Sequence, residues 1–85
     1  MNNYLQSAKT ATTKDLSIAS YLYSSNDIQL VRTERKNKNL VLFHFAPKEE
    51  AEKLIAAYWS DTALVSPRKV FSAQRSLKDL IFSGS

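Results

Sequence analysis

This 85-residue sequence contains two clusters of basic residues whose types and spacing could do chemistry. The clusters consist of Arg32, Arg35, Lys36 and Lys38, and of Arg68, Lys69, Arg75 and Lys78. Lysine and arginine side chains contact phosphates and release counterions from a nucleic-acid backbone, which predicts DNA or RNA binding. The net charge is only +4, so a solvated surface with a few salt bridges is the competing interpretation.

Two phenylalanines, Phe71 and Phe82, accompany the second cluster at helical spacing. Together with Arg75 and Lys78 they fall along one edge of a helix predicted to follow Ser66. Phenylalanine usually belongs to a core, which is the first expectation for both rings. On the surface they would stack on bases or contact a protein partner. Phe71 and Phe82 are therefore the predicted interaction residues.

The other candidates for chemistry have simpler explanations. His44 is the sole histidine, and a lone histidine on a half-apolar strand is usually packed with a satisfied ring nitrogen. Glu49, Glu50 and Glu52 fall early in a predicted helix, where the helix dipole favours acidic side chains. Cysteine is absent and Gly84 is the only glycine, which excludes thiolate sites and glycine-rich phosphate loops. We predict a non-enzymatic protein with no metal and no cofactor.

Length and composition predict one small globular domain. A chain of this size buries only about 60–65% of the surface that its unfolded form exposes. Hydrophobic residues make up 44% of the sequence and aromatic residues 11%, which is enough to fold. The apolar runs are too short to span a bilayer, no signal core follows the first residues, and the lack of cysteine suits a reducing compartment. We expect a cytoplasmic protein without membrane contact.

The N-terminal part predicts a helix that is preceded by a tail or an edge strand. Residues 1–11 alternate only weakly between polar and apolar side chains. Thr12 and Thr13 are typical N-cap residues, so we expect a helix from there to about Ser24. Asn26 would end this helix in the role that glycine usually has.

The middle of the chain predicts a β-hairpin. Residues 28–35 and 40–45 have strand patterns and are joined by an asparagine-containing turn at residues 36–39, where asparagine tolerates a positive φ. The second strand is apolar on both faces, which indicates the centre of a sheet. Two strands alone make a poor sheet. A third strand is expected from the N-terminal segment, from residues 63–65, or from a second copy in a homodimer.

Two further helices are predicted after the hairpin. Pro47 suits the first position of one helix, which would end near Trp59. Ser66 would cap the other helix, with Pro67 at its first position. Trp59, the only tryptophan, is expected to pack in the core, so that its loss would unfold the domain.

Six short motifs are spread along the chain: Thr13-x-Asp15-Leu16, Ala19-x-Tyr21-Leu22, Val41-x-Phe43-x-Phe45, Ala57-Tyr58-Trp59, Ala63-Leu64-Val65-x-Pro67-x-x-Phe71 and Leu77-Lys78. Together they resemble a small family of domains of unknown function from bacteria and their phages. The resemblance covers about residues 9–82. It implies a bacterial, phage or mobile-element setting and supports the order of elements, but it assigns no catalytic or binding residue.

The expected fold class is α+β, in the order helix, β-hairpin, helix, helix. A single domain would span residues 12–82, with a tail or edge strand at residues 1–11 and a tail at residues 83–85. The predicted function is that of an accessory protein that binds nucleic acid, and the alternative is a protein-interaction adaptor or inhibitor. Basic clusters on one face would favour nucleic acid, whereas separation by the acidic second helix would favour a solvated surface.

Overall fold

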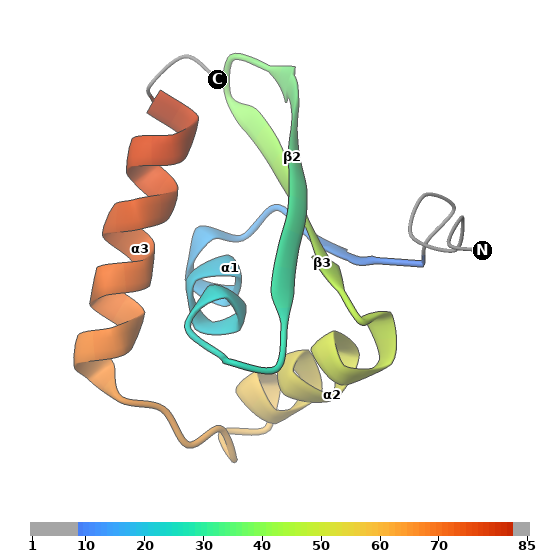
Figure 1. Cartoon of the computed structure of the whole chain (residues 1–85), viewed down its shortest axis with the longest axis vertical. Helices are drawn as coiled ribbons and strands as arrows, with labels where there is room; N and C mark the ends of the chain where they lie inside the picture. The colour runs from blue at the N-terminus through green and yellow to red at the C-terminus, as the bar shows by residue number, and fades with distance from the viewer. Residues whose placement is uncertain (1–8, 83–85) are drawn as a thin grey trace.

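Three antiparallel strands form a sheet with the last strand in its centre, and three helices complete the domain (Figure 1). The elements are β1 (Ala11–Thr13), α1 (Leu16–Tyr23), β2 (Gln29–Asn37), β3 (Leu40–Ala46), α2 (Lys48–Trp59) and α3 (Pro67–Phe82). The computed structural model describes residues 9–82. The predicted α+β class and the order helix, hairpin, helix, helix are confirmed. The third strand, β1, comes from the N-terminal segment, whereas residues 63–65 form no strand.

The central strand β3 has one face that is buried against the helices and one polar face. Phe43 and Phe45 are 2% and 0% exposed, and they belong to a core that α1, α2 and α3 share. His44 points to the opposite face, because neighbouring side chains of a strand alternate. There it lies opposite Thr12 of β1 and Arg32 of β2. The prediction of a central strand covered on both faces by apolar contacts is therefore correct for one face only.

The helix α1 begins at an aspartate instead of a threonine. The carboxylate of Asp15 accepts hydrogen bonds from the backbone N–H groups of Ser17 and Ile18, at 2.8 and 3.1 Å. Thr12 and Thr13 belong to β1. The prediction of a threonine cap was wrong because the chain stays extended through both threonines to pair with β3, so the cap lies two or three residues later.

The left-handed backbone conformation occurs after α2 and not at the predicted asparagines. Asp61, with φ 61°, is the only non-glycine residue of residues 9–82 that has a positive φ. The N–H of Asp61 donates to the carbonyl of Tyr58, and the N–H of Thr62 donates to that of Ala57, which is a Schellman ending. The hairpin turn is held differently, since the Asn37 side-chain carbonyl accepts from the Asn39 N–H at 2.8 Å.

The N-terminal ends of the last two helices agree closely with the prediction. Pro47 is the N-cap of α2 and not its first residue, so this helix begins one residue later than expected. The hydroxyl of Ser66 accepts from the Lys69 N–H at 3.4 Å, and α3 begins at Pro67 as predicted. Trp59, however, is 68% exposed, so its predicted place in the core was wrong.

Within residues 9–82, no helix has both the length and the apolar character that crossing a membrane requires.

Candidate nucleic-acid interface

One hydrogen bond joins the tip of the hairpin to the end of α3. The Arg35 guanidinium donates through Nη2 to the carbonyl of Ile81 at 2.8 Å. Ile81 lies in the last turn of α3, where carbonyls lack partners within the helix and the helix dipole is negative. A cation is therefore favoured at this position. The contact places the hairpin tip beside the C-terminal half of α3 (Figure 1).

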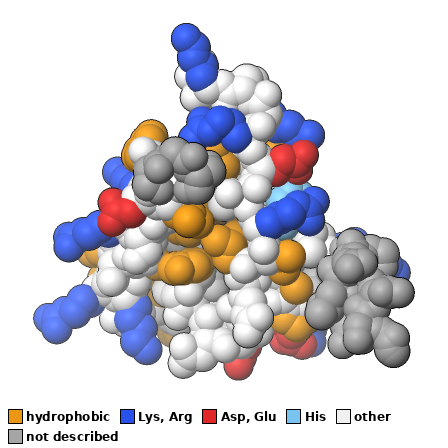
Figure 2. Space-filling model, turned by 45° about the horizontal axis from the view of Figure 1, so that its top comes forward, with side chains coloured by type: hydrophobic (Ala, Val, Ile, Leu, Met, Phe, Trp, Pro, Cys, Tyr) orange, Lys and Arg blue, Asp and Glu red, His pale blue; other side chains and the backbone are white. Residues whose placement is uncertain are grey.

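Five of the eight predicted phosphate-binding residues lie on the hairpin tip and the C-terminal half of α3, the two elements that this contact joins. We define the basic end by these residues: Arg35, Lys36, Lys38, Arg75 and Lys78. All five are exposed. Arg75 lies six residues before Ile81, or about 9 Å along the helix axis. Figure 2 shows lysine and arginine side chains over the hairpin tip and along the neighbouring side of the molecule.

The remaining three predicted residues lie elsewhere. Arg68 and Lys69 occupy the first turn of α3, roughly 18–20 Å along the axis from Ile81. Arg32 lies opposite His44 in the sheet, on the polar face. The eight residues therefore do not form one continuous site, although the hairpin and the second half of α3 do contribute to a common surface.

A polar network on the sheet partly neutralises this surface. Glu34 accepts from Lys36 Nζ at 2.9 Å through one carboxylate oxygen and lies 3.0 Å from His44 Nε2 through the other. The other ring nitrogen of His44, Nδ1, is 3.0 Å from the Thr12 hydroxyl. The prediction that His44 is a packed residue with satisfied nitrogens is confirmed, since its exposed fraction is 7%.

The contacts with Lys36 and then His44 lower the pKa of Glu34 below its ordinary value. A carboxyl whose pKa is lowered by folding stabilises the fold above its unfolded pKa, and this contribution is lost as the pH falls through the folded pKa. We therefore expect Glu34→Gln to lower the melting temperature at pH 7 and to reduce the loss of stability between pH 7 and pH 3. Thermal melts at both pH values measure this. Glu52→Gln is the control, because Glu52 has only a 3.9 Å contact with Lys48; equal pH dependence of wild type and Glu34→Gln would contradict the prediction.

The acidic residues of α2 do not separate the two basic elements. Glu49, Glu50 and Glu52 lie on α2, at the opposite end of the sheet from the hairpin tip (Figure 1). Two of these glutamates face lysines of the same helix, with Lys48–Glu52 and Lys53–Glu50 distances of 3.9 and 3.8 Å. The acidic charge is therefore partly balanced on α2 itself, and α2 does not lie between the hairpin tip and the C-terminal half of α3.

Phe71 and Phe82 lie on the surface of α3. Their exposed fractions are 66% and 76%, so the expectation that they belong to the core was wrong. The core-facing side chains of α3 are instead Ala73 and Leu77. The edge with Phe71, Arg75, Lys78 and Phe82 therefore faces solvent. Its role as an interaction surface stays a prediction.

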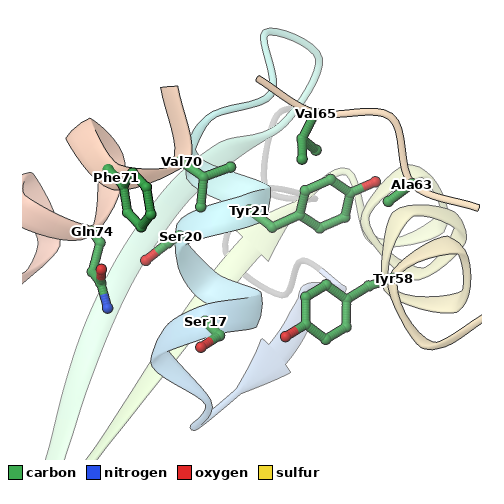
Figure 3. A pocket seen from close by; sticks show the side chains of 9 residues that line it. All are labelled: Ser17, Ser20, Tyr21, Tyr58, Ala63, Val65, Val70, Phe71 and Gln74. Atoms are coloured by element: carbon green, nitrogen blue, oxygen red, sulfur yellow. The ribbon is translucent and has the colours of Figure 1, made fainter. Parts of the chain in front are cut away.

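A pocket of about 290 Å³ lies beside Phe71 (Figure 3). Helix α1, the end of α2, the segment between α2 and α3, and the start of α3 contribute to its walls. The lining residues are Ser17, Ser20, Tyr21, Tyr58, Ala63, Val65, Val70, Phe71 and Gln74. The hydroxyl of Tyr21 is in this wall, and burial raises its pKa. Sequence reasoning missed the pocket because its walls come from four separate segments.

The fold and this surface define a small α+β domain with a basic end and a neighbouring pocket. The model of a domain of unknown function, DUF5659, matches residues 8–83, and the chain belongs to this family. The resemblance to a family of unknown function is thereby confirmed. No curated protein and no solved structure shows a significant match to the chain.

Proposed function

We propose that this protein is a non-enzymatic accessory protein that binds nucleic acid through its basic end. The hydrogen bond between Arg35 and the Ile81 carbonyl carries the proposal, because it joins the two predicted basic elements into one surface. Arg35 can still contact a phosphate, since a guanidinium has five N–H donors and this bond uses one of them.

The charge of the basic end is largely uncompensated. Within residues 9–82, the side chains of Lys38, Arg75 and Lys78 make no ion pair. Lys36 shares its charge with Glu34, and Asp79 is the only acidic residue of α3. Exposed cations without protein partners are the groups that displace counterions from a phosphate backbone. This distribution supports phosphate contacts more strongly at the basic end than on α2.

A salt titration tests the proposal. Fluorescence anisotropy with labelled duplex DNA, single-stranded DNA and single-stranded RNA is expected to show binding at low salt. The logarithm of the binding constant should fall linearly with the logarithm of the salt concentration, with a slope of about −0.7 to −0.9 for each phosphate contact. Polyglutamate is the control for charge alone. Absence of binding to all three nucleic acids at low salt, or equal binding to polyglutamate, would refute the proposal.

A second candidate function is a protein-interaction adaptor or inhibitor. Around the segment between α2 and α3, Trp59, Leu64 and Phe71 are 68%, 96% and 66% exposed. Exposed apolar side chains of this size are typical of protein contact sites. A stoichiometric partner that is retained at high salt, and is lost with Leu64→Asp but not with Lys38→Glu, would favour this function over nucleic-acid binding.

A further inference from the structure

We infer that the pocket beside Phe71 takes up an unpaired base of a single strand whose phosphates lie on the basic end; the inference rests on the proposed nucleic-acid binding. It names the class of nucleic acid, single-stranded, and the site that recognises it. Three features carry the inference: the aromatic walls, the unused polar groups, and the cations that continue from the pocket along α3.

The walls of the pocket offer aromatic surface to a flat ring. Phe71 stands at the rim and is 66% exposed. Tyr21 and Tyr58 line the pocket, with their ring centroids 5.9 Å apart and their planes tilted by 36°. Both faces of a nucleobase are aromatic, and such faces stack on side chains of this kind.

Polar groups without partners surround the same space. Within the described part of the chain, the hydroxyls of Ser17 and Tyr58 and the amide of Gln74 make no hydrogen bond, whereas the Ser20 hydroxyl donates to the Leu16 carbonyl at 2.7 Å. In Figure 3 the Tyr58 hydroxyl points towards α1, on the side of Ser17. The edges of a base carry both donors and acceptors and can satisfy such groups. An aliphatic peptide side chain would leave them unpaired at a cost in free energy.

The cations of the basic end continue directly from the pocket. Phe71, Arg75 and Lys78 stand four and then three residues apart on α3, so their side chains follow one edge of the helix. A strand with one base at Phe71 therefore has its next phosphates over Arg75 and Lys78. This charge complementarity selects an anionic chain as the occupant.

The size of the pocket selects an unpaired base. Its volume of about 290 Å³ is near the lower limit of ligand pockets, which enclose roughly 300–1,000 Å³. A base inside a duplex cannot enter such a pocket unless it leaves the stack, which costs a few kcal/mol. Single strands should therefore bind more tightly than duplexes of the same length.

Anisotropy titrations with a thymidine oligonucleotide, a duplex of equal length and an abasic oligonucleotide test the inference. Phe71→Ala is expected to weaken binding of the thymidine oligonucleotide about 5- to 100-fold and to leave duplex binding unchanged. Tyr58→Phe, which keeps the ring and removes the hydroxyl, should give a smaller loss. Tyr23→Ala is the matched control, because Tyr23 is an exposed aromatic residue of α1 that belongs neither to the pocket nor to the edge of α3 with Phe71, Arg75 and Lys78. The abasic strand should bind wild type and Phe71→Ala equally.

The outcomes separate the inference from the proposed function. If the wild type binds neither single strands nor duplexes, the proposed function itself is wrong. If it binds both equally and Phe71→Ala changes neither, nucleic-acid binding stands and the base pocket is overturned; this is also the result expected if a protein partner fills the pocket. An equal loss with Tyr23→Ala would overturn it as well. Thermal melts confirm that each variant is folded.

Discussion

Phe45→Ala is expected to lower the free energy of unfolding by about 3–5 kcal/mol, because it leaves a cavity in the core between the central strand and the helices. Phe45 is 0% exposed and lies between Ala11 of β1 and Leu30 of β2. A domain of this size has a total stability on the order of 5–15 kcal/mol, so the loss is a large part of the whole. Urea unfolding followed by circular dichroism measures it. If Phe45→Ala does not fold, Phe45→Leu, with a smaller change in volume, supplies the measurement.

Trp59→Ala is the comparison for Phe45→Ala, because it removes an exposed aromatic side chain instead of a buried one. The indole is 68% exposed, and its described ring contact is with Tyr58, at a centroid distance of 5.5 Å. Loss of a surface side chain with one aromatic contact costs roughly 0.5–1.5 kcal/mol. If Trp59→Ala and Phe45→Ala lower the free energy of unfolding equally, a core that contains Phe45 and excludes Trp59 is contradicted.

The double variant Lys38→Glu, Lys78→Glu is expected to weaken nucleic-acid binding by roughly tenfold or more at low salt, because it removes two phosphate contacts and adds repulsion. The slope of the logarithm of the binding constant against the logarithm of the salt concentration should become shallower by about 2. Anisotropy titrations at several salt concentrations measure both effects. The two side chains come from the hairpin and from α3, so the variant tests the surface that Arg35 and Ile81 join.

Lys48→Glu, Lys53→Glu is the matched control for this variant. Either pair of reversals takes the net charge from +4 to zero, but Lys48 and Lys53 lie on α2, at the far end of the sheet. The control is expected to keep most of the binding. Equal losses in both double variants would show that the total charge, and not the basic end, determines binding, and would refute the proposed interface.

Local chemistry explains the parts of the fold that could be predicted. The apolar side chains on both faces of residues 40–45 indicated a central strand, and Ser66 and Pro67 indicated the start of α3, because both signals lie within a few neighbouring residues. The predicted start of the first helix was less accurate. Its start depends on whether Thr12 and Thr13 pair with His44 and Phe43 of β3, which lie 32 and 30 positions further along the chain.

The exposed aromatic residues show the limit of periodicity. The spacing along α2 and α3 placed Trp59, Phe71 and Phe82 on definite helix faces. Whether a face is buried depends on which other element packs against it. Helix α3 packs mainly against α1, and its buried side chains are Ala73 and Leu77 instead of the phenylalanines. The pattern therefore predicted the helices but could not predict which of their aromatic side chains form the core.

The sequence by itself determined the α+β class, the order of the elements and the identity of the basic residues, because these depend on composition and on interactions between near neighbours. Only the tertiary structure decided which basic residues meet. The contact from Arg35 to Ile81 spans 46 positions, and the pocket beside Phe71 is enclosed by four segments. Such contacts form only when distant elements pack, and no local pattern records them.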